Sequence, residues 1–326
     1  MSPRLAYRDA LLALLASDAR TVCLDSDTGL FTGADFGAAA GRYLDLGIAE
    51  QCLMGAAAGL AAGGARPFVH TMATFAASRA LEFVKIDIAY NGLPVRIAAT
   101  HAGVSAGRLG PTHHALEDLA VMRALPNMTV VVPGDAEQVV ALLEQVVDLP
   151  GPVYLRLDRG AAEPLPHPMP APVLGRIQVL SPGGEVVLAA IGPQPLAATL
   201  AAAALLREDG VGVTVLHVHT LAPFDTEAFL HAVAPASLVV SVEAHWIIGG
   251  LGSTLAEALC AAAPRRLLRV GIPRAFVSLV GSEREILAHY GVSGEAIHQQ
   301  VLGELGLGPP VITPSGPPHR QPHPTF

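Results

Sequence analysis

The sequence predicts an α/β protein built from two doubly wound, mostly parallel sheets. Short apolar runs alternate with helix-like segments along nearly all of the 326 residues. Half of the residues are hydrophobic (51%) and only 15% are charged, as expected when strands are buried on both faces. A proline-rich stretch interrupts the alternation, so we expect a domain over residues 1–160, a linker over 161–182 and a second domain over 183–308. The remaining residues, 309–326, are rich in proline and histidine and are predicted to be disordered.

The first domain begins with an amphipathic segment that predicts a helix, followed by the apolar run TVCLDSD. This run, residues 21–27, is typical of a buried strand, and its end carries two carboxylates. Open α/β sheets bind their ligands at the carboxyl ends of strands, so Asp27 is a candidate cofactor-binding residue. The alternation continues through a small-residue helix after residue 50, a strand from 65, a helix from 78, a strand ending at 101, a glycine-rich loop, a helix from about 116, a strand from 128, a helix from 136 and a strand from 151.

The second domain repeats this alternation on a smaller scale. Its predicted elements are a strand at 185–192, a long Ala/Leu helix, a strand at 212–220, a helix from Thr226, a strand at 237–245, a helix at 249–263 and a strand at 267–273. The segment EAHWIIGGLGS lies between a strand and a helix, where its glycines permit close packing or an anion-binding loop.

Composition narrows the classes of function. The formal net charge of -8 argues against a nucleic-acid-binding surface, and no window holds the roughly 18 uncharged apolar residues of a membrane-spanning helix. The N-terminal segment lacks a cleavage signal, which predicts a cytoplasmic protein. Cys23, Cys52 and Cys260 are far apart, which predicts buried free thiols rather than a disulfide or a zinc site, and we expect this chain to bind no metal itself.

Glu50 is the residue of the first domain that most needs an explanation. Its carboxylate precedes a run of small apolar residues in GRYLDLGIAEQCLMGAAAGLAA, residues 41–62. A carboxylate buried there would need a partner or would have a raised pKa, and both are ways of performing proton chemistry. The alternative is structural: Asp45 would cap a helix, and Glu50 would belong to its first turns, favoured by the helix dipole.

Several long motifs in this sequence occur in one family in the same order. They are LDLGIAEQ, ATHAGVSAGRLGPTHHALEDLAVMRALPN, VVVPGD and VVSVEAHWIIGGLGSTLAEAL. Together they resemble the C-terminal half of a transketolase, over roughly residues 4–306. The resemblance implies a pyrimidine-binding domain followed by a transketolase C-terminal domain. It also implies a thiamine-diphosphate-dependent transferase that moves a two-carbon ketol unit from a ketose or ketose phosphate to an aldehyde.

The resemblance assigns cofactor roles to several residues. In this family the Glu that matches Glu50 hydrogen-bonds N1′ of the aminopyrimidine ring and favours its imino tautomer. The bonds of the substrate are made and broken at the cofactor itself. Phe75 matches an aromatic residue that stacks on the pyrimidine, and Met72 would offer a further apolar contact. From the residues alone, a place in the core is the favoured explanation of Phe75.

Substrate roles follow from the same resemblance. His101 and His113 match the two histidines that contact the substrate's hydroxyls and the region of the reacting carbon. Arg159 matches an arginine that holds the sugar phosphate, and Arg8 aligns loosely with another, although a solvated helix residue explains Arg8 equally well. Arg156 is then expected to be a surface charge, because a spacing of three residues places it on the opposite side of the strand from Arg159.

Two departures from the family pattern change the expectation. The loop has Arg108-Leu109 where typical transketolases have an acidic pair, so the usual pentose phosphates are in doubt as substrates. Arg108 would instead meet an anionic group, although an exposed loop arginine explains it as simply. The GDG motif with its distant Asn, which binds the diphosphate through Mg²⁺ or Ca²⁺ in this family, does not occur here. We therefore expect a separate N-terminal subunit that holds the metal and the diphosphate, in an α2β2 assembly with an apolar interface.

Three alternatives stay open. The chain could serve a deoxyxylulose-phosphate-synthase-like reaction, although His101 in the motif ATH argues against it. It could be the β subunit of a 2-oxo acid dehydrogenase, although THHALED followed by ALPN argues against that. The chain could also be a non-catalytic scaffold or regulatory subunit, which would explain the absence of the acidic pair. The presence of Glu50, His101 and His113 together argues against this alternative.

Overall fold

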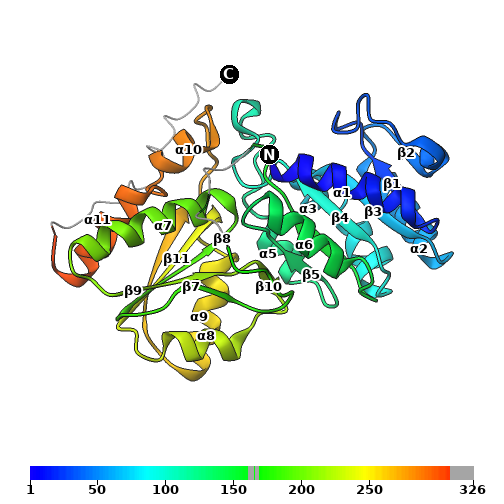
Figure 1. Ribbon diagram of the computed structural model, residues 1–326. Helices are drawn as coiled ribbons and strands as arrows, with labels where there is room; N and C mark the ends of the chain where they lie inside the picture. Colours follow the sequence, from blue (N-terminus) through cyan, green and yellow to red (C-terminus); the bar gives the residue numbers. More distant parts are fainter. Residues whose placement is uncertain (161–164, 166–168, 309–326) are drawn as a thin grey trace, which may run out of the picture.

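The computed structural model describes residues 1–160, 165 and 169–308 of the chain. It contains two α/β units, each with a central sheet and helices on both faces (Figure 1). The predictions for most of 161–168 and for the tail 309–326 lie outside the described residues. Among the helices described, none has both the length and the apolar character needed to cross a bilayer.

The first half of the chain follows the predicted alternation. Its elements are α1 (Pro3–Ser17), β1 (Thr21–Asp25), η1 (Gly37–Arg42), β2 (Tyr43–Asp45), α2 (Glu50–Ala62), β3 (Arg66–Met72), α3 (Ala73–Ala77), α4 (Leu81–Phe83), η2 (Val84–Tyr90), β4 (Arg96–Thr100), η3 (Gly107–Leu109), α5 (Asp118–Arg123), β5 (Thr129–Val131), α6 (Ala136–Val146) and β6 (Val153–Arg156). The helix predicted from residue 78 is a short α-helical turn, α4, that continues as the π-helix η2.

The first sheet has seven strands in the order β10-β5-β6-β4-β3-β1-β2. All neighbouring strands are parallel except β10 (Thr220–Ala222), which comes from the second half of the chain and pairs antiparallel with β5. Neighbouring side chains on a strand point to opposite faces, so Cys23 packs toward α1 and α6 while Leu24 packs toward α2. Both faces are thus covered by helices, which explains the continuous apolar runs in the sequence.

The second half of the chain contains the remaining elements. They are β7 (Gln178–Ser181), β8 (Val186–Ile191), α7 (Pro193–Glu208), β9 (Val213–His217), β10, α8 (Thr226–Val233), β11 (Leu238–Trp246), α9 (Leu251–Ala262), β12 (Arg266–Ile272), α10 (Glu283–His289) and α11 (Gly294–Leu305). They form a five-stranded sheet in the order β12-β11-β8-β9-β7, parallel except for β7. Part of the predicted linker over 161–182 is therefore a strand, because β7 pairs with β9.

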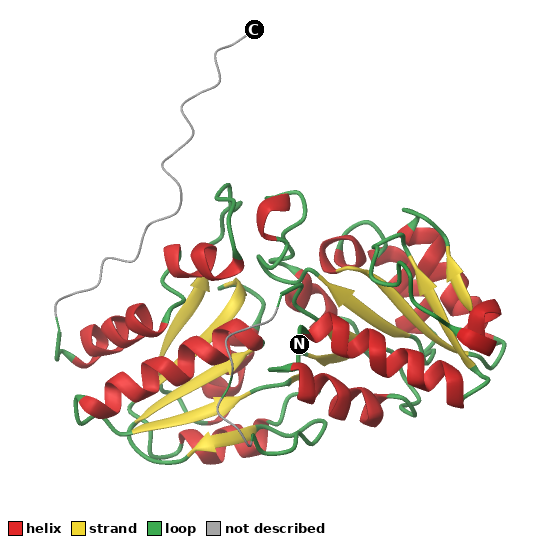
Figure 2. Ribbon diagram, turned by 45° about the horizontal axis from the view of Figure 1, so that its top comes forward, coloured by secondary structure: helices red, strands yellow, loops and turns green. Residues whose placement is uncertain are grey.

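The two units share an apolar core. One cluster of buried side chains joins Leu53 of α2 and Ile97 of β4 to Val239 of β11 and Leu255 of α9. The loop after β4 also approaches the second unit closely: a Cβ placed on Gly103 would lie 2.7 Å from the carbonyl oxygen of Ala244. The N-terminal end of α1 lies near this junction in both views (Figures 1 and 2). The junction therefore holds the loop after β4 in a fixed position.

Two of the three cysteines differ from the expectation of buried thiols. Cys23 is buried in β1, as predicted, but Cys52 and Cys260 are exposed on helices. Both lie on the outward side of a helix whose opposite side packs on a sheet, and the apolar sequence around them did not reveal this. None of the three forms a disulfide.

Candidate active site

Glu50 is the first residue of α2 and is almost fully buried, with 2% of its surface exposed. The residue before it, Ala49, is the N-cap and provides no side-chain hydrogen bond. The predicted cap, Asp45, is exposed and accepts a hydrogen bond from the backbone of Gly47 instead, so that part of the structural alternative is wrong. A buried carboxylate requires a partner, and that partner is Arg79, whose Nη1 donates to Glu50 Oε2 at 2.8 Å.

Arg79 connects Glu50 to two aromatic rings. Its guanidinium carbon lies 4.6 Å from the centre of the Phe75 ring, within the range of a cation–π contact. The Phe75 ring meets the His113 ring edge-on at 5.5 Å between centroids. Helix α3 places Phe75 at the carboxyl end of β3, and Arg79 follows four residues later. The structure thus brings Glu50, Phe75 and His113 together through an arginine that the sequence analysis did not single out.

The two predicted histidines belong to one closed loop. An antiparallel bridge between Gly103 and Ala115 closes this loop, and His101 and His113 lie near its two ends. His101 adopts a left-handed backbone conformation (φ 58°) directly after β4, and its Nδ1 lies 3.0 Å from Thr100 Oγ1. Burial, then the charges of Arg159, Arg4 and His113, lower the pKa of His101 to about 4. The imidazole is therefore neutral near pH 7 and can both donate and accept a hydrogen bond.

Basic side chains gather beside His101. Arg4 at the start of α1, His70 in β3, His101 and Arg159 form what we call the basic cluster. Burial, followed by the charges of His101 and Arg4, lowers the pKa of His70 to about 3. Burial and the neighbouring charge of Arg159 also lower the pKa of Arg4. These mutual effects place the four residues within electrostatic reach of one another.

The basic cluster has polar atoms without partners. Arg4 Nε, His70 Nδ1 and the hydroxyl of Tyr7 are buried and make no hydrogen bond among the described residues. Tyr7 stacks on His70, with ring centroids 5.9 Å apart. No acidic side chain of the described residues forms an ion pair with Arg4 or Arg159. Two guanidinium groups close together without an anion form a site suited to an anionic ligand group.

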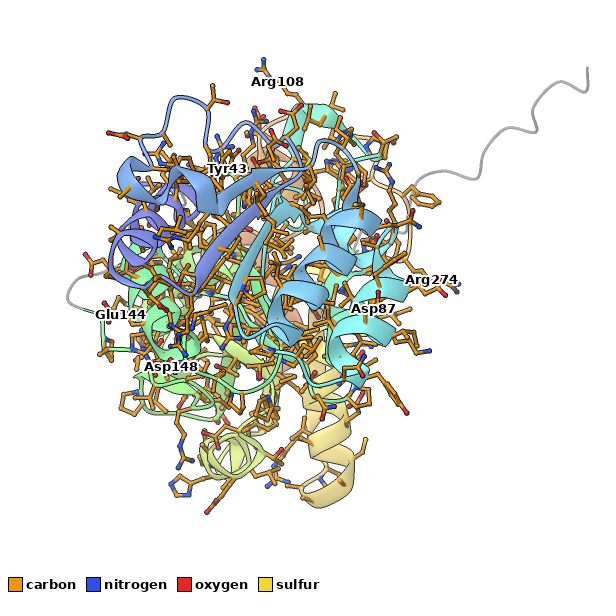
Figure 3. The ribbon with its side chains drawn as sticks, turned by 90° about the vertical axis from the view of Figure 1, so that its right-hand side faces the viewer. Tyr43, Asp87, Arg108, Glu144, Asp148 and Arg274 are labelled. Atoms are coloured by element: carbon orange, nitrogen blue, oxygen red, sulfur yellow. The ribbon has the colours of Figure 1, made fainter. Side chains whose placement is uncertain are left out.

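The structure places four other predicted residues apart from these contacts. Arg8 bonds its neighbour Asp9 on the surface of α1. Arg108 is exposed and projects from the end of its loop into solvent (Figure 3), where its charge acts on Glu285. Asp27 is exposed in the loop after β1, and Met72 is half-buried at the end of β3.

Three residues of the site were missed by the sequence analysis: Arg4, His70 and Arg79. Arg4 carried a signal, because a cation in the first turn of a helix opposes the helix dipole and so needs another reason to be there. His70 carried a weaker one, since it is a polar residue inside the buried run of β3. Arg79 lies in the turn after α3, four residues after Phe75, and the sequence alone did not connect it with Glu50.

Arg156 is not a surface charge, so that expectation is wrong. Its side chain is 1% exposed and donates to both carboxylate oxygens of Asp118, from Nε at 2.7 Å and from Nη2 at 3.1 Å. Nη2 also donates to the Ala244 carbonyl of the second unit at 3.0 Å, and the Tyr154 hydroxyl donates to Asp118 at 2.8 Å. Burial by itself would lower the pKa of Arg156, but the Asp118 carboxylate raises it. The second unit covers this side of the strand, so Arg156 is a structural residue.

The glycine-rich segment of the second unit is also structural. The buried carboxylate of Glu243 accepts hydrogen bonds from the backbone of Leu251 at 2.7 Å and of Gly252 at 2.9 Å, at the start of α9. A Cβ on Gly250 would lie 2.0 Å from the Glu243 carboxylate, so only glycine fits there. The predicted anion-binding loop is therefore filled by the protein's own carboxylate.

The described residues contain no group of three His, Cys, Asp or Glu side chains placed to hold a metal ion. The site thus combines a buried carboxylate, an aromatic ring, His113 and a basic cluster whose two arginines form no ion pair with an acid in the described part of the chain. Such a set can bind a planar hydrogen-bonding group at Glu50 and Phe75 and an anionic group at Arg4 and Arg159.

Two family models match the chain. Residues 1–164 match the model described as "Transketolase, pyrimidine binding domain", and residues 175–297 match "Transketolase, C-terminal domain".

Curated relatives match most of the chain. The chain is 38% identical over 293 residues to the 6-deoxy-6-sulfo-D-fructose transketolase subunit SqwH of Clostridium sp. (strain MSTE9), covering 89% of this chain and 90% of that protein. It is 37% identical over 257 residues to one subunit of the apulose-4-phosphate transketolase of Actinobacillus succinogenes, covering 78% of this chain and 82% of that protein.

A solved structure has the same fold. It is described as "Split gene transketolase, inactive beta4 tetramer" and matches with a TM-score of 0.84 at 38% sequence identity. The match covers 95% of this chain and 100% of that chain.

Proposed function

The chain belongs to the transketolase family, and on this premise we propose that it is the C-terminal subunit of a two-component, thiamine-diphosphate-dependent transketolase. The enzyme transfers a two-carbon ketol unit from a ketose or ketose phosphate to an aldehyde acceptor. The observation that carries the proposal is the continuous site formed by Glu50, Phe75, His113 and the basic cluster.

The residues present fit half of the cofactor. A buried carboxylate beside an aromatic ring suits the aminopyrimidine, which needs a hydrogen-bond acceptor and a stacking surface. The described residues offer no metal-binding group for the diphosphate. We therefore assign the diphosphate, and the Mg²⁺ or Ca²⁺ that binds it, to a partner subunit.

Thiamine diphosphate, when bound, supplies the nucleophilic carbon that takes up the two-carbon unit. The buried carboxylate of Glu50 would hold the aminopyrimidine through a hydrogen bond and would share a proton with it at the carboxylate oxygen. Phe75 orients the ring by stacking. His113, in contact with Phe75, lies at the aromatic side of the substrate site.

His101 and His113 handle the substrate's hydroxyl groups. His101 is neutral at physiological pH because its pKa is lowered to about 4, first by burial. A neutral imidazole both donates and accepts, so His101 can orient a hydroxyl and pass on its proton without adding charge to the site.

Arg4 and Arg159 hold the anionic end of the substrate. Two guanidinium groups bind a phosphate or a sulfonate through several charge-assisted hydrogen bonds. The names of both relatives include a sugar with a strong anion, a sulfonate in one and a phosphate in the other. Arg4 takes the place that the sequence analysis gave to Arg8, and Arg108 lies outside the site.

The partner is the N-terminal subunit of a split enzyme. Both relatives are named as single subunits of a transketolase, and a split-gene enzyme is among the solved structures, which supports two separate chains. We propose an α2β2 assembly, in which each site uses residues of both kinds of subunit.

The proposal is tested by coexpression with the product of a neighbouring gene that contains the GDG and Asn motif. We expect the two chains to copurify and the pair to transfer a two-carbon unit from a ketose phosphate to an aldehyde when thiamine diphosphate and Mg²⁺ are present. Release of CO₂ from pyruvate would favour the deoxyxylulose-phosphate-synthase-like alternative instead. A pair that assembles and binds the cofactor but has neither activity would favour the scaffold.

A further inference from the structure

Arg79 occupies both contacts that the proposed cofactor site offers on this chain. Its guanidinium donates a 2.8 Å hydrogen bond to Glu50 Oε2 and lies 4.6 Å from the centre of the Phe75 ring. An aminopyrimidine needs the same carboxylate as acceptor and the same kind of aromatic surface for stacking. Resting on the function proposed above, we propose that Arg79 competes with the aminopyrimidine and must leave Glu50 before the cofactor binds.

The chemistry of the two groups explains why one can replace the other. A guanidinium is planar, carries N–H donors at its edge and stacks on aromatic faces. An aminopyrimidine is planar as well and directs hydrogen-bonding nitrogens toward a carboxylate. Arg79 therefore satisfies the buried Glu50 carboxylate, which would otherwise lack a charged partner.

The exposure of the two partners indicates which one moves. The Glu50 side chain is 2% exposed, whereas that of Arg79 is 46% exposed, so the arginine is the outer partner of the pair. An arginine at the surface loses little free energy on turning into water, because exposed ion pairs contribute little. Glu50 is fixed at the start of α2 and cannot move as easily.

The ion pair also opposes the chemical role proposed for Glu50. The Glu50 oxygen that accepts from Arg79 Nη1 is one of the two carboxylate oxygens that could bond the aminopyrimidine. Glu50 can hold the cofactor through this oxygen only after Arg79 has left it. Arg79 thus acts as a placeholder that stabilises the buried carboxylate until the cofactor replaces it.

The test is a calorimetric titration of thiamine diphosphate, at fixed Mg²⁺, into the complex of this chain with its N-terminal subunit. Arg79→Leu removes the competitor, and we expect a dissociation constant about three- to ten-fold lower than that of the wild-type complex. Arg79→Lys keeps the charge but loses the planar stacking group, so its dissociation constant should fall between the two. Arg266→Leu is the matched control, because Arg266 is another exposed arginine paired with a glutamate, Glu304, and it should leave binding unchanged.

The same comparison made in Glu50→Gln chains separates competition for the Glu50 carboxylate from a general structural effect of losing Arg79. In Glu50→Gln chains the carboxylate that Arg79 pairs with is gone, so adding Arg79→Leu should give less than about a two-fold change. Binding to Arg79→Leu that equals or is weaker than wild-type binding would overturn the placeholder role while leaving the proposed function intact. If neither wild type nor variant binds the cofactor, the proposed function fails, and the inference fails with it.

Discussion

Arg156 and Arg159 lie three residues apart in the chain, yet their surroundings are opposite. Arg156 is buried between the two units and donates to both oxygens of Asp118, to which Tyr154 also donates. Arg159 follows the same strand but belongs to the basic cluster, where Arg4 is a second cation and no carboxylate pairs with either among the described residues. Arg156 has a carboxylate partner, whereas within residues 1–160, 165 and 169–308 neither Arg4 nor Arg159 forms an ion pair with an acidic side chain.

This difference separates structural residues from ligand-binding ones. A buried charge with complete partners stabilises the junction of the units and leaves nothing for a ligand to bind. Neighbouring cations without an anion raise the free energy of the folded chain, and a bound anion lowers it again. The comparison is consistent with a structural role for Arg156 and with the substrate-binding role proposed for Arg159.

The largest expected effect is a loss of catalytic rate when Glu50, in the part of the site next to the basic cluster, is substituted. Glu50→Gln keeps a hydrogen-bonding side chain but removes the carboxylate that shares a proton. We expect kcat to fall by about 10²–10⁴-fold, with copurification of the partner unchanged. Steady-state kinetics on the assembled enzyme measures this, and activity within a few-fold of wild type would contradict the role of Glu50.

The next largest effect is on stability, in the balanced region. Asp118→Asn leaves the Arg156 guanidinium buried without its counter-charge, which costs about 3–5 kcal/mol. Urea denaturation of the isolated chain should show a much lower midpoint. A loss below about 1 kcal/mol would mean that water or another group compensates Arg156, and the contrast between the regions would weaken.

Substitutions of the two arginines of the basic cluster should chiefly change substrate binding. Arg159→Ala and Arg4→Ala each remove charged hydrogen bonds to the substrate's anion, worth about 1.5–3 kcal/mol, or roughly 10- to 100-fold in KM. The KM for an unphosphorylated ketose should stay nearly constant. An equal rise of KM for phosphorylated and unphosphorylated substrates would remove these arginines from the anion site.

The basic cluster should also make the fold sensitive to acid. The pKa of His101 is about 4 in the folded chain, mainly because of burial, and about 6.5 when unfolded. Unfolding therefore takes up a proton below pH 6.5, and stability is lost as the pH falls from about 6.5 to about 4. His101 contributes up to about 1.4 kcal/mol per pH unit in this window. His101→Gln should flatten the decline in urea midpoint, and an unchanged pH profile would speak against a buried neutral imidazole.

The smallest effect concerns Arg8, which already has a carboxylate partner in Asp9. Arg8→Ala removes a surface ion pair worth less than about 1 kcal/mol and no substrate contact. We expect KM and kcat within two-fold of wild type in the same kinetic assay. A ten-fold rise in KM for the phosphorylated substrate alone would return Arg8 to the anion site in place of Arg4.

Local patterns predicted much of the fold. Apolar runs bounded by polar residues identified the main parallel strands, because burial on both faces leaves a continuous signal. Strands β7 and β10 were missed, since each is short and exists only through pairing with a distant strand. That β10 completes the sheet of the first unit could not be read from the sequence around Thr220.

The candidate site residues that the sequence analysis named came from motifs. Glu50, His101 and His113 stood out by their motifs, and the structure joins Glu50 and His113 through Arg79 and Phe75. Arg79 itself escaped notice because its role depends on a contact between the turn after α3 and the start of α2, which are distant in the sequence. Arg156 was misjudged for a similar reason: strand periodicity gives the side of a sheet but not which side another unit covers.

The central claim is that this chain forms only half of a cofactor site. Calorimetry of thiamine diphosphate with Mg²⁺ against this chain alone, the N-terminal subunit alone and the two mixed tests it directly. We predict binding of one cofactor per pair of chains in the mixture and binding at least about 100-fold weaker to either chain alone. Equal affinity of the isolated chain and the mixture would contradict the claim, as would a stable complex that binds no cofactor.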